Sequence, residues 1–119
     1  MLEGKKNNNL SCENNHDLIV TIVDRGNSEL ILKASKEAGA EGGTVIYGRG
    51  TGIHETSTIV GIPIEPEKEI ILTVIPKSKT KEILKAIIDA GNLNKPGIGI
   101  VFVLEIKEVA GISHLLENL

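Results

Sequence analysis

The alternation of apolar and polar positions along the chain predicts four β-strands. Each strand is a short run rich in valine, isoleucine and threonine, bounded by glycine, proline or charged residues. The runs are LIVTIV at residues 18–23, TVIYG at 44–48, EIILTVI at 69–75 and IVFVLEI at 100–106.

Two segments between these runs repeat their apolar residues every three or four positions, as one face of an amphipathic helix does. The first begins at Asn27 or Ser28, whose side chains can cap a helix, and ends at Gly39. The second begins at a capping Ser78 and ends at Gly91. The resulting order of elements predicts an α+β, ferredoxin-like βαββαβ fold with a four-stranded antiparallel sheet.

Two stretches lie outside this pattern. Residues 1–16 are polar and hold five asparagines, so we expect a flexible N-terminal segment followed by one folded domain at residues 17–119. Residues 49–66 are rich in glycine, threonine and proline and have no helical period, so we expect a long exposed loop between the second and third strands.

The predicted strands are apolar on both faces. Leu72 and Val74 point to one face of the third strand while Ile71 and Ile75 point to the other, and the first and fourth strands alternate in the same way. Two helices cover only one face of such a sheet, and an apolar face left in water costs about 25 cal/mol per Å². We therefore expect further copies of the chain to cover the second face.

Composition narrows the class of protein. The 119-residue chain has a formal net charge of −3 and two aromatic residues, which argues against general nucleic-acid binding. Cys12 is the one cysteine, so no intrachain disulfide forms. Apolar runs fall short of a membrane span, and we expect a cytoplasmic protein.

Residues suited to catalysis or metal binding are few. His54 and Glu55, in the predicted loop, could act as metal ligands or as an acid–base pair, but His16 and His114 are far away in sequence. We interpret His54 as a solvated loop residue and expect neither a metal site nor an enzyme.

Two glycine-rich turns each carry a cation. The first is GRGTG at residues 48–52, with Arg49, and the second is KPGIG at residues 95–99, with Lys95. Backbone N–H groups of such turns can converge on an anion. The alternatives are a hinge for the loop in the first case and a plain turn into the fourth strand in the second. Neither turn has the spacing of a nucleoside-triphosphate P-loop.

Three stretches resemble the P-II signal-transduction family, and the similarity extends over residues 17–112. TVIYGRGTG at 44–52 is similar to the family's second strand and the start of its T-loop, EIILTVIP at 69–76 to its third strand, and NKPGIGIVFV at 94–103 to its B-loop. The resemblance implies a trimer that binds ATP or ADP between subunits, often with 2-oxoglutarate. It also implies a T-loop that docks onto transporters and enzymes of nitrogen metabolism.

The resemblance assigns roles to residues of both turns. It implies partner binding by Ile53, His54 and Glu55 of the T-loop. The implied ligand-binding residues are Arg49, Gly50, Gly52, Lys95, Gly97 and Gly99.

The chain also departs from the family pattern. Ile100 stands where the family has a phosphate-binding lysine, Ile53-His54 replaces Arg-Gln, and Leu72 replaces a glutamate. No lysine or arginine follows Lys107, where the family has phosphate-binding arginines. A triphosphate needs such charge-assisted contacts, so we expect a less charged ligand, such as a mononucleotide or cyclic nucleotide, or no nucleotide.

The sequence thus predicts a trimeric, P-II-like regulatory protein. We expect a small effector, with an adenine nucleotide as the candidate, at clefts between subunits, and a loop at residues 49–66 that controls a membrane transporter or metabolic enzyme. A ligand-free structural or assembly module and a CutA-like metal-binding trimer are the alternatives. The identity of the effector and of the partner stays open.

Overall fold

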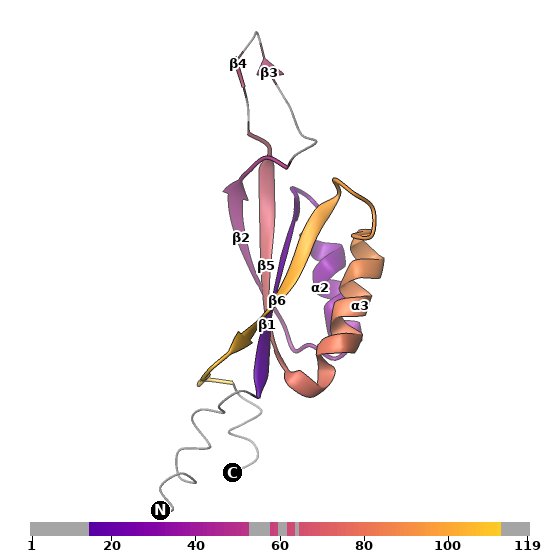
Figure 1. Ribbon diagram of the computed structural model, residues 1–119, viewed down its shortest axis with the longest axis vertical. Helices are drawn as coiled ribbons and strands as arrows, with labels where there is room; N and C mark the ends of the chain where they lie inside the picture. Colours follow the sequence, from indigo (N-terminus) through magenta and orange to yellow (C-terminus); the bar gives the residue numbers. More distant parts are fainter. Residues whose placement is uncertain (1–14, 53–57, 60–61, 64, 113–119) are drawn as a thin grey trace, which may run out of the picture.

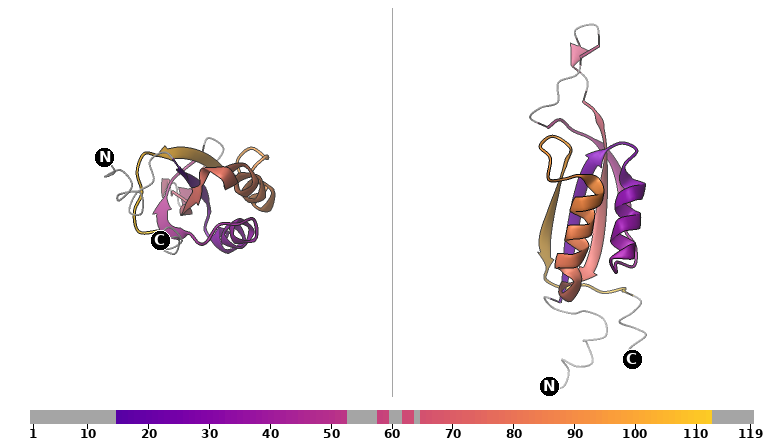
Figure 2. Two further views of the ribbon diagram at one scale, coloured as in Figure 1. Left: turned by 90° about the horizontal axis from the view of Figure 1, so that it is seen from below. Right: turned by 90° about the vertical axis from the view of Figure 1, so that its right-hand side faces the viewer.

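The computed structural model describes residues 15–52, 58–59, 62–63 and 65–112. Its main feature is a four-stranded antiparallel sheet with both helices packed on one face (Figures 1 and 2). The strands lie in the order β2 (Thr44–Arg49), β5 (Glu67–Pro76), β1 (His16–Asp24), β6 (Gly99–Ile106). The helices are α2 (Ser28–Glu37) and α3 (Thr80–Gly91). The predicted α+β, ferredoxin-like βαββαβ fold is confirmed.

The segment between β2 and β5 contains regular structure that the sequence did not predict. β3 (Thr58–Ile59) and β4 (Ile62–Pro63) pair with each other in an antiparallel two-stranded ladder. They lie beyond the end of the main sheet (Figure 1). β2 also runs through Arg49, so the connecting segment is residues 50–66 rather than 49–66.

Odd-numbered strand positions form the core under the helices. Successive side chains of a strand point to opposite faces, so one parity faces α2 and α3. The fully buried isoleucines come from both layers: Ile19, Ile71 and Ile75 from the sheet, and Ile31, Ile83 and Ile87 from the helices. None of the helices in the described part of the chain is long and apolar enough to span a membrane.

Even-numbered strand positions form the opposite face, which we call the open face. Five large apolar side chains there keep 39–54% of their surface exposed: Ile46, Val74, Ile100, Phe102 and Leu104. The prediction that both faces of the sheet are apolar is confirmed. The helices cover one of these faces only (Figure 2).

A residue from the sheet caps the start of α2. The sequence predicted a cap from Asn27 or Ser28, but Asn27 makes no side-chain cap and its amide donates to the Asp24 carbonyl. Glu69, which is 6% exposed, accepts a 2.8 Å hydrogen bond from the Ser28 N–H instead. Hydrogen bonds from the Ser28 side chain and the Gly26 N–H lower the Glu69 pKa. β5 is an inner strand of the sheet, so Glu69 does not lie on an exposed sheet edge.

The start of α3 also differs from the prediction. A 3₁₀ turn at Lys77–Lys79 precedes the helix, and Ser78 does not cap it. Asp17 holds this turn, since its carboxylate accepts 2.7 Å hydrogen bonds from Lys77 Nζ and Thr80 Oγ1. Burial alone would raise the Asp17 pKa, but these hydrogen bonds outweigh it and the pKa is lowered.

The capping role of Glu69 predicts that the difference in stability between wild type and a Glu69→Gln variant depends on pH. Its folded-state pKa lies below the ordinary value of a glutamate side chain. The stabilisation by its charge is therefore fully present above the unfolded pKa and is lost as pH falls through the folded pKa. Glu69→Gln should lower the urea midpoint at pH 7, and the gap to wild type should close as pH falls below about 4. Glu82→Gln, at an exposed carboxylate in the first turn of α3, is the matched control. An equal gap at pH 7 and pH 3 would contradict the role of the Glu69 charge.

Candidate functional site

The two glycine-rich turns meet at one end of the open face. Strand register brings this about, because Ile22 pairs with Ile100 and Arg49 pairs with Glu67. The ends of β1 and β2 and the starts of β5 and β6 therefore lie at the same end of the sheet, where the connecting segment leaves it (Figure 1).

Both turns line one cavity of about 640 Å³, which we call the open-face cavity. Turns about 45 positions apart in sequence thus contribute to a single site. Its lining comprises Ile22, Arg49, Gly50, Thr51, Gly52, Lys68, Ile70, Pro96, Gly97, Ile98, Gly99 and Ile100.

Five of the six predicted ligand-binding residues line this cavity, and Lys95 does not. Lys95 is exposed, and its backbone N–H donates to the Asn92 carbonyl in the turn that follows α3. The predicted partner-binding residues Ile53, His54 and Glu55 lie outside the described residues, so their role stays a prediction.

The walls of the cavity are largely apolar. Ile22, Ile70 and Ile100 line it from three neighbouring strands, and Ile98 adds an apolar side chain from the second turn. Ile22, Ile70 and Ile98 are not among the predicted site residues, and Ile100 is predicted there only as the replacement for a phosphate-binding lysine of the family. Their even parity was readable from the sequence, but the position of the turns above them depends on strand register.

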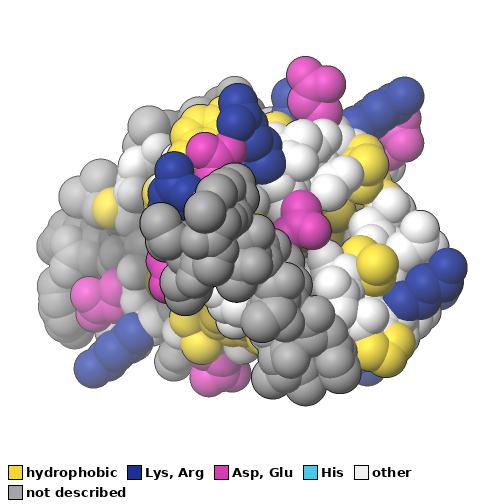
Figure 3. All heavy atoms as spheres, turned by 90° about the horizontal axis from the view of Figure 1, so that it is seen from above, with side chains coloured by type: hydrophobic (Ala, Val, Ile, Leu, Met, Phe, Trp, Pro, Cys, Tyr) yellow, Lys and Arg dark blue, Asp and Glu magenta, His cyan; other side chains and the backbone are white. Residues whose placement is uncertain are grey.

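Two cations of the described residues line the cavity, and one of them is closely paired with an acid. Lys68 Nζ lies 2.7 Å from Asp24 Oδ1, on the strand beside it, so an acid already compensates its charge. The Arg49 side chain is 58% exposed. Seen from this end, basic and acidic side chains are interspersed among those drawn in colour (Figure 3). Such a surface suits a ligand with little charge better than one with several phosphates.

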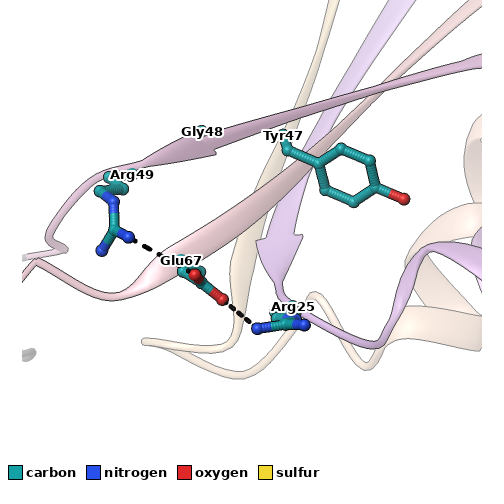
Figure 4. Close-up of a pocket in the computed structure, with 5 residues that line it drawn as sticks. All are labelled: Arg25, Tyr47, Gly48, Arg49 and Glu67. Carbon is teal, nitrogen blue, oxygen red and sulfur yellow. Dashed lines mark hydrogen bonds and ion pairs between the residues drawn. The ribbon is translucent and has the colours of Figure 1, made fainter.

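Arg49 also lines a second cavity, of about 450 Å³, which we call the arginine cavity (Figure 4). The other residues around it are Arg25, Tyr47, Gly48 and Glu67. Glu67 lies between the two arginines: its Oε1 is 2.5 Å from Arg25 Nη1, and its Oε2 is 3.5 Å from Arg49 Nη2.

Comparisons with known proteins agree with this architecture. The model of the family described as nitrogen regulatory protein P-II matches residues 16–114. The chain belongs to the P-II family. A crystal structure of Arabidopsis thaliana PII bound to citrate matches with a TM-score of 0.65 and 21% identity, covering 83% of this chain and 84% of that one. No curated protein gave a significant match.

Family membership establishes the general role of the protein, which is regulatory signal transduction. The structural likeness supports the P-II fold, and at 21% identity it does not carry ligand or partner over to this chain. In the described residues there is no group of three or more His, Cys, Asp or Glu side chains arranged to hold a metal ion.

The fold of this P-II protein requires glycine to different degrees at the positions of the two turns. Gly97 has a φ of 83°, a conformation that L side chains rarely adopt. At Gly99 a Cβ would lie 2.7 Å from the Ile22 carbonyl oxygen and 3.0 Å from Leu93. At Gly50 the nearest atom, in Lys68, is 4.0 Å away. Strand pairing therefore requires Gly99 even without a ligand, whereas the fold places no such demand on Gly50.

Alanine substitutions at Gly99 and Gly50 should have unequal effects on the stability of the protein. Gly99→Ala should destabilise the protein by about 1–3 kcal/mol, because the new methyl group overpacks against the β1 backbone. Gly50→Ala should leave stability within about 1 kcal/mol of wild type, since glycine-to-alanine changes at compatible positions have small effects. Urea unfolding measures both changes. Equal stabilities for the two variants would contradict the close approach of Gly99 to β1.

Proposed function

We propose that this protein senses a small anionic effector, with an adenine nucleotide as the candidate, in the open-face cavity. The observation that carries the proposal is the convergence of residues 50–52 and 96–99 on one cavity beside Arg49. Backbone N–H groups of glycine-rich turns suit the anionic group of the effector. The isoleucine walls suit its apolar or aromatic part.

The charges around the cavity favour an effector with a single anionic group. Asp24 compensates Lys68, and the contacts of Arg49 with protein oxygens are long, at 3.3 and 3.5 Å. Ile100 supplies an apolar side chain where the family has a phosphate-binding lysine. A mononucleotide or cyclic nucleotide therefore fits better than ATP. The similar Arabidopsis protein is bound to citrate, a small organic anion whose three carboxylates support a small anionic ligand but not the limit to a single anionic group.

The effector site is completed by further copies of the chain in a trimer. The exposed apolar side chains of the open face favour this assembly, because burial of that surface in a monomer is incomplete. The open-face cavity opens on the same face, so a neighbouring copy that covers the face also borders the cavity. The trimer is what the P-II resemblance implies for this face.

The output of the protein is control of a partner through residues 50–66, rather than catalysis. This segment leaves the sheet directly beside the cavity, so an effector can act on it over a short distance (Figure 1). A membrane transporter or a metabolic enzyme is the partner we propose, with Ile53, His54 and Glu55 as contacts. The location that fits this role is the cytoplasm.

The trimer is testable with one charge placed on the open face. Light scattering coupled to size exclusion should give about three times the 12.7 kDa of one chain for the wild type. Leu104→Glu should give one chain, because a charge buried in an apolar interface is strongly unfavourable. Leu30→Glu makes the same change at an exposed leucine of α2 and should remain trimeric. A monomeric wild type at micromolar concentration would contradict the assembly.

Effector binding is testable by calorimetry with AMP, cyclic AMP and ATP. AMP or cyclic AMP should bind more tightly than ATP. Arg49→Ala should weaken binding of the tighter ligand about ten- to a hundredfold, as expected when a charged hydrogen bond is lost. Lys95→Ala should have a smaller effect, because Lys95 is outside the cavity lining. Tighter binding of ATP would refute the single-anion proposal, and no binding of any of the three would refute an adenine nucleotide effector.

A further inference from the structure

The arginine cavity gathers side chains that are rare in this chain. Both arginines of the sequence line it, whereas the other basic residues of the chain are all lysines. Tyr47, the one tyrosine, lines it as well. Arginine and tyrosine are enriched where proteins recognise other molecules, because a planar guanidinium or ring makes directional contacts. Their meeting in one cavity of about 450 Å³ indicates a binding site.

The arginine cavity and the open-face cavity lie on opposite faces of the sheet. Tyr47 and Glu67 occupy odd-numbered strand positions, whereas the open-face cavity has walls of Ile22, Ile70 and Ile100 at even-numbered positions. A ligand in the arginine cavity is therefore separate from the effector proposed for the open-face cavity. The inference drawn here goes beyond the proposed function and does not depend on it.

The helices leave this part of their own face uncovered. Val45 of β2 packs against the core, but Tyr47, two positions further along the same face, is 73% exposed. Tyr47 thus lies outside the core, and its ring reaches the surface at the cavity that Arg25 and Glu67 also line (Figure 4). An exposed ring beside guanidinium groups can stack on a planar ligand group.

The charges of the cavity favour a ligand with one negative charge. Arg25 and Arg49 are two positive groups and Glu67 is one negative group, so the lining has one positive charge in excess. Among the described residues, the Arg25 side chain contacts Glu67 through Nη1 alone. A guanidinium carries five N–H donors, so Nη2 and Nε of Arg25 keep donors for a second carboxylate.

We propose that the arginine cavity binds a small aromatic carboxylate. The carboxylate accepts hydrogen bonds from Arg25 and balances the excess positive charge, and the aromatic ring packs against Tyr47. The volume of the cavity is in the range of small-molecule sites. Because the Arg25 side chain is 70% exposed, water competes for these contacts, and we expect weak binding in fast exchange.

The first test is an NMR titration with benzoate. The chain has two arginines, so two arginine Nε signals are expected, and the loss of one in Arg25→Ala assigns both. Benzoate should shift the Arg25 signal and the Tyr47 ring signals with one common dissociation constant. The methyl signals of Ile22, Ile70 and Ile98 should stay in place, because these side chains line the other cavity.

The second test measures the contribution of charge. Arg25 lines the arginine cavity and not the open-face cavity. Arg25→Ala should weaken benzoate binding about fivefold, as expected at the upper end for exposed ion pairs, with the Tyr47 ring as the reporter. Lys85→Ala removes the cation of the exposed Lys85–Asp89 pair on α3 and should leave benzoate affinity unchanged.

The third test measures the contribution of the ring, with the Arg25 signal as the reporter. Wild type should bind benzoate about two- to tenfold more tightly than acetate, which is the range expected for an aromatic contact. Tyr47→Leu should remove most of this preference, and Tyr47→Phe should keep it. A residue with a merely structural role would not change the ratio of the two affinities.

Three results would overturn the proposal. They are the absence of a saturable shift at Arg25 with benzoate, equal benzoate affinity in Arg25→Ala and wild type, and an equal preference for benzoate in Tyr47→Leu and wild type. Shifts of the open-face isoleucine methyl groups with benzoate would contradict the separation of the two cavities. If wild type binds benzoate as described but binds no AMP, the effector proposal fails and this site stands.

Discussion

The structure depends on one constraint, which is that two helices cover only one face of a four-stranded sheet whose strands are apolar on both. On the covered face, fully buried isoleucines from both layers form the core. On the open face, other large apolar side chains remain partly exposed, including Phe102 and Leu104. The assembly and the position of the effector site proposed above both follow from this difference.

The candidate site lies at the end of the sheet where strand pairing brings the two glycine-rich turns together and where several charged side chains lie. Gly99 must lack a side chain for β6 to approach β1, and this close approach places the second turn beside Gly50–Gly52. The Lys68–Asp24 and Arg25–Glu67 pairs already satisfy several charges at this end. Arg49 is left with the longest contacts of this group, at 3.3 and 3.5 Å.

Features that depend on local pattern were predictable from the sequence, and those that depend on long-range register were not. The alternation of side chains along the strands predicted two apolar faces of the sheet, and the glycine content predicted both turns. The cap on α2 was missed because Glu69 is 41 positions from Ser28 in sequence. The compensation of Lys68 was missed for the same reason, since Asp24 meets it only through the pairing of β1 with β5. Lys95 was placed in the site by resemblance, whereas the turn after α3 leaves it outside the cavity lining.

The central claim, that the effector binds at the open-face cavity, is tested most directly by an NMR titration of isoleucine methyl groups with AMP. The account predicts that signals of Ile22, Ile70 and Ile98 shift on binding, because these side chains line the cavity. Signals of the core residues Ile31 and Ile83 should stay in place. Binding that leaves the three cavity isoleucines unshifted would contradict the account.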